Sequence, residues 1–325
     1  MRVKHPVRTT FNLLFRHAMV EAQLVITRRC NLSCGYCTEF DKTSACIPLD
    51  ELKSRVDVLH GLNVVNITLL GGEPLLHPDL PELVAYADRA AQVSVTTNGF
   101  LLTEELIGRL NEAGLANMEV SVDALRADRT AYIQKCLKTV RAKLQLLQRA
   151  ARFDVHVNLV LCEQTRGEFT DTIAELEDLG FSVSLGLLHD AKGCIAIGGP
   201  EYVALWGHYY ARAQAFSYIE KEYGAQLLSG ARPRWKCRAG SRFLYVDEFG
   251  NTQFCSAQRG RLNKPLATYT RHDIAEHAKT FKGCEDGCSL LCHYRDSSID
   301  NRPFHAAASM IKLAVRRSVR AAAVT

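Results

Sequence analysis

The chain has 325 residues, of which 47% are hydrophobic and 23% are charged, a composition that excludes a disordered or low-complexity protein. No apolar run approaches the length that crosses a bilayer, and residues 1–20 lack the apolar stretch of a secretory signal. The net charge of +5 is a weak electrostatic footprint for nucleic acid, and no nucleic-acid-binding module is recognisable. We expect a globular, cytoplasmic protein with one large domain and a smaller one.

Both ends of the chain are basic. Residues 1–20 carry four lysines and arginines and no acid, and the chain after Asp300 carries five and again no acid. Such amphipathic ends can lie on an anionic membrane surface. The alternative is a terminal helix docked on the protein with its basic face in water. Peripheral membrane contact is therefore left open for the segments 1–22 and 301–325.

From residue 24 to residue 188, short apolar runs alternate with helical patterns. The predicted strands are 24–27, 64–70, 93–97, 118–122, 155–161 and 183–188, and the predicted helices are 48–60, 79–91, 103–113, 129–151 and 167–179. Six β–α units in series predict a parallel sheet, either an open doubly wound sheet or a partial TIM-like barrel. In both architectures the chemistry gathers at the C-terminal ends of the strands.

The pattern changes after the sixth strand. A long helix is predicted over 200–222, with its aromatic residues in packing roles, and glycine and proline interrupt the periodicity within 223–232. A hairpin is predicted in RFLYVDEFGNTQFC, with its turn near 249–251, and a cysteine-dense loop follows. The predicted class is α/β, with domains over 1–22, 23–222, 223–300 and 301–325.

Twelve cysteines clustered at short spacings in a chain of this length indicate metal binding rather than disulfides. Cys30, Cys34 and Cys37 follow the first predicted strand at C-x3-C-x2-C spacing. Three thiolates on one loop cannot close a four-coordinate structural site, but they can hold three irons of a 4Fe–4S cluster and leave the fourth open. An open iron can bind a small molecule, so the loop predicts a redox enzyme. The alternatives are zinc and cysteines that are close by chance.

The segment CNLSCGYC resembles the CxxxCxxC signature of the radical S-adenosylmethionine (SAM) superfamily, including an aromatic residue, Tyr36, before the last cysteine. In that family SAM binds the open iron, and its reductive cleavage gives a 5′-deoxyadenosyl radical that removes hydrogen from the substrate. The resemblance implies a partial (β/α)6 TIM-like barrel with a 4Fe–4S cluster and SAM as cofactors. The protein itself would supply binding, orientation and exclusion of water.

A second motif, GGEP, ends the second predicted strand at Gly71, Gly72, Glu73 and Pro74. Two glycines let a backbone approach a ligand closely, and Glu73 can accept a hydrogen bond from an ammonium group. The motif resembles the family's GGE, which meets the methionine amino group of SAM.

Weaker matches to the family follow at the ends of later strands, and for each residue the alternative is a turn-former or a cap. The resemblance implies a pocket floor at Thr97 and Asn98, contacts to the ribose or carboxylate of SAM from Ser121, Asp123 and Asn158, and an adenine flanked by Leu188 with Gly186 and Leu187.

Five more cysteines lie in the C-terminal region, at Cys237, Cys255, Cys284, Cys288 and Cys292. They fit one auxiliary iron–sulfur cluster with one cysteine left over, and a structural zinc is the alternative. The pattern resembles the twitch or shortened SPASM extension of radical SAM enzymes, although full SPASM uses seven cysteines and two clusters. We expect Cys237, Cys255 and two of the last three, including Cys288, to bind the cluster.

The other four cysteines are expected to be small buried hydrophobic residues, at Cys46, Cys136, Cys162 and Cys194. His189 and Asp190 follow the sixth strand and are the candidates for catalytic substrate contact or proton transfer. A structural role for the pair is the alternative.

These features predict a hydrogen-abstracting oxidoreductase or peptide-modifying enzyme whose auxiliary cluster takes an electron from the substrate. The expected partners are a small-molecule or peptide substrate and an electron donor such as flavodoxin or ferredoxin. A second interpretation is an enzyme for a membrane lipid or polyprenyl substrate. A third is a non-catalytic iron–sulfur electron carrier or a zinc-stabilised interaction module, although an electron carrier has no need of GGEP or an open iron.

Overall fold

The computed structural model describes residues 18–128, 133–212, 218–306 and 308. The chain divides into two compact units, which we call unit 1 (Met1–Asn158 with Ala239–Lys279) and unit 2 (Leu159–Arg238 with Thr280–Thr325). The predicted basic ends, 1–22 and 301–325, fall largely outside the described residues. Among the described residues, no helix has both the length and the apolar character needed to span a membrane.

Within the described residues, nine strands form a mostly parallel sheet in the order β6-β5-β4-β3-β2-β1-β7-β8-β9. The first six are β1 Glu21–Thr27, β2 Asn66–Gly71, β3 Gln92–Thr97, β4 Asn117–Ser121, β5 Asp154–Leu161 and β6 Ser182–Leu187. Each overlaps one predicted strand, so the six predicted strands are confirmed. They follow one another without the reversal of order that marks a doubly wound sheet. The fold is therefore the predicted α/β class of the partial TIM-like barrel.

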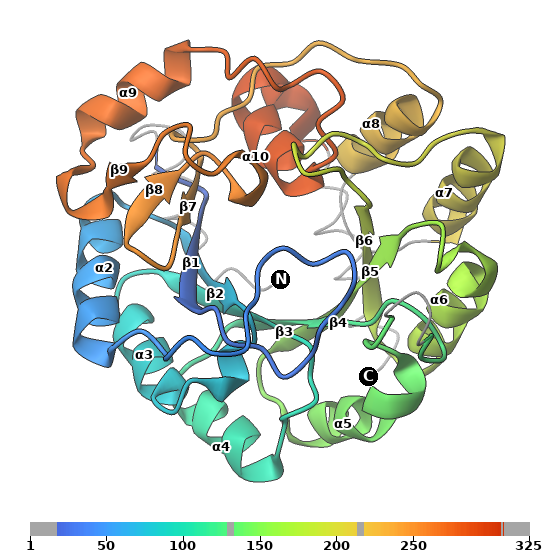
Figure 1. Ribbon diagram of the computed structural model, residues 1–325, viewed down its shortest axis with the longest axis horizontal. Coiled ribbons are helices and arrows are strands. Elements are labelled where there is room, and N and C mark those ends of the chain that lie inside the picture. Colours follow the sequence, from blue (N-terminus) through green and yellow to red (C-terminus); the bar gives the residue numbers. More distant parts are fainter. Residues whose placement is uncertain (1–17, 129–132, 213–217, 307, 309–325) are drawn as a thin grey trace. The chain divides into compact units, whose positions relative to one another are not determined.

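Helices cover one face of the strands of unit 1 (Figure 1). They are α2 Leu49–Gly61, α3 Leu80–Ala87, α4 Glu104–Glu112 and α5 Leu137–Ala150, and short 3₁₀ turns occur at η1 Pro74–Leu76, η3 Ser256–Gln258 and η4 Leu266–Thr268. Each of the four helices overlaps its predicted range. Thr103 caps α4, because its hydroxyl accepts the Leu106 N–H at 3.1 Å.

The strands of unit 1 separate apolar from polar side chains with a period of two. Fully buried residues such as Leu24, Val95 and Met118 alternate with polar ones. The strand register aligns the polar positions across all five strands, and we call this set the polar face: Glu21, Gln23, Asn66, Thr68, Gln92, Ser94, Thr96, Asn117, Glu119, Ser121, Asp154, His156 and Asn158. The interior of a TIM barrel is usually filled by branched apolar residues, so this polar face suits a polar ligand better than a packed core.

The predicted hairpin is present but belongs to the sheet of unit 1. Strand β7 Phe243–Val246 pairs antiparallel with β8 Asn251–Gln253, and the turn between them uses Gly250 at φ +78°. Strand β7 also pairs in parallel with β1, where Ala22 lies opposite Leu244. The hairpin thus extends the βα sheet. Strand β9 Lys264–Pro265 and helix α9 Arg271–Lys279, which follow in unit 1, lay outside the sequence prediction.

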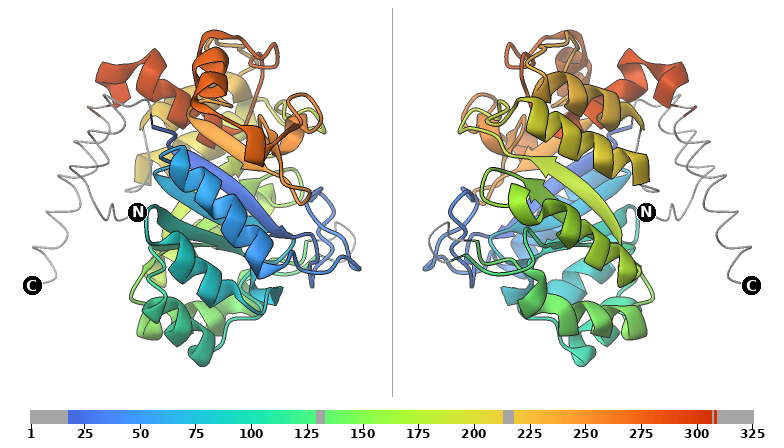
Figure 2. Two further views of the ribbon diagram at one scale, coloured as in Figure 1. Left: turned by 90° about the vertical axis from the view of Figure 1, so that its left-hand side faces the viewer. Right: turned by 90° about the vertical axis from the view of Figure 1, so that its right-hand side faces the viewer.

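Unit 2 contains η2 Arg166–Glu168 and the helices α6 Phe169–Asp178, α7 Pro200–Arg212, α8 Tyr218–Leu228 and α10 Leu291–Asn301 (Figure 2 gives two further views). The prediction of one helix over 200–222 is wrong. The indole of Trp206 in α7 lies against Gly224 in α8 and donates to the Lys221 carbonyl oxygen at 2.8 Å, which one straight helix would not allow. Trp206 and Tyr209 are buried, so the packing role predicted for these two aromatics is confirmed.

Gly224 was expected to interrupt the helical periodicity, but it lies inside α8. A glycine is needed at this position, because Trp206 leaves no room for a side chain. A Cβ at Gly224 would lie 2.1 Å from a ring carbon of Trp206. We predict that Gly224→Ala lowers the free energy of unfolding by about 1–3 kcal/mol, as overpacked cores do. The measurement is chemical denaturation followed by circular dichroism.

The matched control is Gly207→Ala in α7, where a Cβ would meet no atom within 4 Å. This substitution should raise the free energy of unfolding by about 0.5–1 kcal/mol, because alanine loses less entropy than glycine in a helix. Equal effects of the two substitutions would contradict the proposed contact between α7 and α8.

Candidate active site

The loop after β1 carries Cys30, Cys34 and Cys37, and backbone hydrogen bonds close its base. The Cys30 N–H donates to the Asp41 carbonyl oxygen at 3.0 Å, and the Asp41 N–H donates to that of Arg28 at 2.7 Å. Within the loop, the Cys37 N–H lies 3.1 Å from the Cys34 carbonyl oxygen. The three predicted ligands therefore share one loop that is held at both ends.

The thiols of this cysteine loop are shielded from water to different degrees. Cys34 is buried, whereas Cys30 and Cys37 are half-buried. Burial raises the pKa of the Cys34 thiol to about 11 and also raises the pKa of Cys30. Since the thiolate is the form that binds metal, a bound cation has to supply the charge that stabilises it here.

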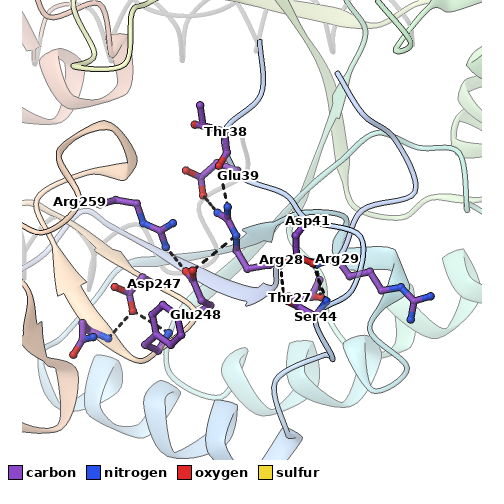
Figure 3. A network of polar contacts seen from close by, with 12 residues as sticks. Thr27, Arg28, Arg29, Thr38, Glu39, Asp41, Ser44, Asp247, Glu248 and Arg259 are labelled. Atoms are coloured by element: carbon purple, nitrogen blue, oxygen red, sulfur yellow. Dashed lines mark hydrogen bonds and ion pairs between the residues drawn. The ribbon is translucent and has the colours of Figure 1, made fainter. Parts of the chain in front are cut away.

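Arg28 joins the end of β1 to the far side of the cysteine loop and to the β7–β8 turn (Figure 3). Its guanidinium donates to the Thr38 carbonyl oxygen at 2.9 Å and pairs with Glu39 at 3.0 Å. A second carboxylate, Glu248, lies 3.9 Å from Arg28 and also pairs with Arg259. Several charges in one shielded network hold more firmly than an isolated surface pair. The network fixes the base of the loop against the hairpin.

The glycines of GGEP bring the end of β2 against the backbone of β1. A Cβ at Gly71, where φ is +132°, would lie 2.1 Å from the Thr27 carbonyl oxygen, and one at Gly72 would lie 2.3 Å from that of Arg29. The Gly72 N–H donates to the Thr27 carbonyl oxygen at 2.8 Å. The close approach expected from the motif is therefore made to the base of the cysteine loop. Pro74, also in the motif, is buried at the start of η1.

The Glu73 carboxylate is 1% exposed and holds the end of β3. It accepts hydrogen bonds from the Leu75 N–H at 3.0 Å, the Thr97 hydroxyl at 2.6 Å and the Asn98 N–H at 2.8 Å. Burial raises the pKa of Glu73, and these three bonds oppose the rise. In this structure Glu73 links two strand ends, and the contact to an ammonium group stays a prediction.

Asn98 connects the end of β3 to the cysteine loop. Its amide nitrogen donates to the side-chain oxygen of Asn31 at 2.8 Å and lies 3.9 Å from the Cys30 sulfur. Thr97 and Asn98, which were predicted as a pocket floor, therefore lie between Glu73 and the first cysteine. The structure brings together the ends of β1, β2 and β3.

Ser121 and Asn158 face each other on neighbouring strands. They are partners in the β4–β5 ladder, and the Val122 N–H donates to the Asn158 carbonyl oxygen at 3.0 Å. Both belong to the polar face of unit 1, Ser121 as the last residue of β4 and Asn158 within β5. Their contacts to SAM stay predictions.

Asp123 is 1% exposed and lies beside the cysteine loop. Its Oδ2 accepts from the Tyr36 hydroxyl and lies 3.3 Å from the ammonium of Lys135, which is 4.9 Å from the centroid of the Tyr36 ring. Its Oδ1 is buried without a hydrogen-bond partner. A buried carboxylate oxygen without a hydrogen bond lowers the stability of the fold, so this position suits a ligand that carries a hydroxyl or N–H group. Lys135 was missed by the sequence analysis because a lone lysine before a helix carries no motif.

In unit 2, Asp190 forms a turn after β6. Its Oδ1 accepts the N–H groups of Cys194 at 2.9 Å and Lys192 at 2.8 Å, and these bonds lower the pKa of Asp190. The His189 ring nitrogen Nδ1 lies 2.8 Å from the Asp190 carbonyl oxygen. These bonds give Asp190 a structural role, and a catalytic role for the pair stays a prediction.

Leu188 directly follows β6, and its backbone still pairs with β5 within unit 2. Its N–H donates to the Leu161 carbonyl oxygen at 3.1 Å, and its own carbonyl oxygen accepts the Ala196 N–H at 3.0 Å. The backbone of Leu188 is therefore fixed on both sides, and its contact to adenine stays a prediction.

Most of the cysteines predicted to bind the auxiliary cluster belong to unit 2. The Tyr223 hydroxyl donates to the Cys288 carbonyl oxygen at 2.6 Å, and the pKa of Tyr223 is raised by burial and by the neighbouring Cys288 and Cys237. Two of the predicted ligands thus lie around one tyrosine. Unit 2 contains Cys237, Cys284, Cys288 and Cys292, and unit 1 contains Cys255.

The four scattered cysteines divide into two kinds. Cys136 and Cys162 are buried, as predicted, but Cys46 and Cys194 are half-buried. Cys194 also forms a β-bridge with Cys288, which brings it to the cysteine-dense loop of unit 2. The spacing along the chain concealed this neighbour, because 93 residues separate the two cysteines.

The donor sets suit iron–sulfur chemistry. No disulfide joins any of the twelve cysteines, and in the described part of the chain no three Cys, His, Asp or Glu side chains converge on one point that would hold a single metal ion. Soft thiolates select zinc or iron–sulfur clusters, and a loop of three cysteines beside an unmet acceptor oxygen fits a cluster that binds a further ligand.

We predict that Gly72→Ala disrupts the cysteine loop, because its Cβ would lie 2.3 Å from the Arg29 and 2.4 Å from the Arg28 carbonyl oxygen. The protein should retain only about half of the wild-type iron after anaerobic reconstitution, measured by metal analysis, because a displaced loop misplaces its ligands while the cysteines of unit 2 are unchanged.

The matched control is Gly108→Ala in α4, where a Cβ would meet nothing within 4 Å. It should keep the wild-type iron content. If Gly72→Ala also kept it, the contact between β2 and the loop would not matter for metal binding.

Residues 24–178 match the radical SAM superfamily. The GTP 3′,8-cyclase of Chlorobaculum tepidum is 37% identical over 134 residues, which cover 37% of this chain and 40% of that protein. The chain therefore spans less than half of that relative.

Two solved structures share the fold. Streptococcus suis SuiB bound to precursor peptide SuiA matches with a TM-score of 0.62 at 14% identity, over 89% of this chain and 74% of SuiB. AnSMEcpe with bound AdoMet matches with a TM-score of 0.59 at 15% identity, over 94% of this chain and 98% of anSMEcpe. Together with the cysteine loop and GGEP, these comparisons show that residues 24–178 form a radical SAM domain, the domain whose cofactors are a 4Fe–4S cluster and SAM.

Proposed function

We propose that this radical SAM enzyme removes a hydrogen atom from a peptide substrate and oxidises it with the help of an auxiliary iron–sulfur cluster. The observation that carries the proposal is the second group of cysteines in unit 2, of which Cys237 and Cys288 lie beside Tyr223. The likeness to SuiB and anSMEcpe supports it, since it extends over nearly the whole chain.

The cysteine loop of unit 1 is proposed to hold the first cluster through Cys30, Cys34 and Cys37. When bound, this cluster and SAM supply a 5′-deoxyadenosyl radical that takes a hydrogen atom from the substrate. The chain's own part is to hold the loop against β2 and to offer Asp123 as an acceptor. Glu73 after β2 and Thr97 and Asn98 at the end of β3 are buried, which keeps water from this edge.

The cysteines of unit 2 are proposed to hold the auxiliary cluster, which would accept the electron left on the substrate while a proton leaves to solvent. Aromatic rings shield this region: Tyr223 stacks on Tyr294 with ring centroids 3.7 Å apart, and the Trp235 ring lies 5.1 Å from Tyr294. An apolar shell of this kind limits solvent access to a cluster. Cys237 and Cys288 are the neighbours of this aromatic group.

A second candidate substrate is GTP, because a GTP 3′,8-cyclase is 37% identical over 134 residues of this chain. The charges on the polar face disfavour GTP as the substrate. The thirteen positions of that face include Glu21, Glu119 and Asp154 but no lysine or arginine. A triphosphate would meet negative charge there, whereas the amide and amine groups of a peptide would meet acceptors. A lipid substrate rests only on the basic ends, which lie largely outside the described residues.

The experiment supplies reduced, reconstituted protein with SAM and either a deuterated peptide fraction or deuterated GTP. We expect 5′-deoxyadenosine to form and to carry deuterium from the peptides, as read by mass spectrometry, because hydrogen is taken from the substrate. Cys34→Ala should form none. Deuterium arriving only from GTP would replace the peptide proposal with the second candidate.

The auxiliary cluster is tested by iron content. Wild-type protein should hold about eight irons, and Cys288→Ala about four, because one of two 4Fe–4S clusters is lost. Cys162→Ala, at a buried cysteine away from both predicted ligand sets, is the control and should keep the wild-type content. About four irons in the wild-type protein, unchanged in Cys288→Ala, would contradict the auxiliary cluster.

A further inference from the structure

Two consecutive residues before α5, Gln134 and Lys135, contact the cysteine loop of unit 1. The Gln134 side-chain oxygen accepts the N–H of Ser33 at 2.7 Å. The Lys135 ammonium lies 4.9 Å from the centroid of the Tyr36 ring and 3.3 Å from Asp123 Oδ2. One contact is made on each side of Cys34. Neither residue belongs to a sequence motif.

The backbone sets the position of both residues. The Asp123 N–H donates to the Lys135 carbonyl oxygen at 2.7 Å, and the Leu137 N–H donates to that of Ala124 at 2.8 Å. Ala124 also forms a parallel β-bridge with Cys136. The segment that leads into α5 therefore runs beside the segment that leaves β4, and Lys135 is held next to Asp123.

Lys135 compensates the charge of a buried carboxylate. Asp123 is 1% exposed, so its negative charge has little contact with water and depends on the ammonium beside it. The ammonium lies on Oδ2, the oxygen that also accepts from Tyr36. Lys135 and Tyr36 thus contact the same oxygen, and together they fix the orientation of the Asp123 carboxylate.

The other oxygen, Asp123 Oδ1, is the one that the chain leaves without a hydrogen bond. A carboxylate paired with an ammonium accepts hydrogen bonds and does not donate them. Asp123 Oδ1 can therefore accept a hydrogen bond from a hydroxyl or an N–H of a ligand, and it repels a ligand's carboxylate. Of the two contacts that the family resemblance implied for Asp123, this pairing favours the ribose hydroxyl of SAM over its carboxylate.

We propose that Gln134 and Lys135 are positioning residues for the cofactor site. Gln134 holds the backbone of the cysteine loop between Cys30 and Cys34, and Lys135 turns the Asp123 carboxylate so that Oδ1 accepts a ribose hydroxyl of SAM. The inference rests on the proposed function, because it assumes that SAM binds beside this loop.

The test measures the dissociation constant of SAM from its effect on the electron paramagnetic resonance spectrum of the reduced cluster. Lys135→Met should weaken SAM binding at least about tenfold, because one partner of a buried charge pair is lost. Lys135→Arg, which keeps the charge, should restore binding to within about threefold of the wild type. The control is Lys143→Met in α5, whose ammonium donates to the Leu102 carbonyl oxygen at 2.6 Å, and it should bind SAM as the wild type does.

A double-mutant cycle separates positioning from a general loss of structure. Asp123→Asn should weaken binding, and Asp123→Asn with Lys135→Met should be no weaker than the weaker single variant. This pair also removes both buried charges together, so it carries the test if Lys135→Met alone does not fold. Additive losses, or unchanged binding in Lys135→Met, would overturn the role of Lys135.

Gln134 has a different expected signature. Gln134→Ala should lose cluster absorbance faster than the wild type in the presence of an iron chelator, while its affinity for SAM stays within about twofold, because its bond is to the loop backbone. Unchanged cluster loss would overturn its role. A wild-type protein that holds iron but shows no spectral change with SAM would instead contradict the proposed function itself.

Discussion

The site depends on the close approach of two strand ends. The carbonyl oxygen of Thr27 at the end of β1 accepts the N–H of Gly72 at 2.8 Å, and neither Gly71 nor Gly72 has room for a side chain. This contact places the first turn after β2 against the base of the cysteine loop. Arg28 holds the other side of the base through Glu39. The ends of β1 and β2 therefore position the loop. Its cysteines lie at the C-terminal ends of the strands, where α/β folds bind ligands.

Two buried carboxylates organise the same edge in different ways. Glu73 is met by three donors from its own turn and from β3, so it serves as a structural link. Asp123 is met on one oxygen only, by Tyr36 and Lys135, and its Oδ1 is left for a donor from outside the chain. Buried polar groups in folded proteins are nearly always paired, so an unpaired carboxylate oxygen beside the cysteine loop marks a point at which a ligand is expected.

The sequence predicted the six parallel strands, the helices α2 to α5, the hairpin and the radical SAM domain, because period-two and helical patterns and the C-x3-C-x2-C spacing are local signals. It failed where distant segments meet. The pairing of β7 with β1, the packing of Trp206 on Gly224 and the contacts of Lys135 all join residues whose spacing carries no pattern. Glu73 was found through its motif, but its bonds to Thr97 and Asn98 became visible only in the structure.

The whole mechanism requires that the cysteine loop of unit 1 carries an iron–sulfur cluster with one iron open to SAM. This requirement can be tested by metal analysis of anaerobically purified protein, joined with Mössbauer spectroscopy of the iron-57 form before and after SAM is added. We expect a 4Fe–4S cluster in which one iron site changes its spectrum when SAM binds. Protein that contains only zinc, or a cluster whose iron sites all stay unchanged by SAM, would contradict it.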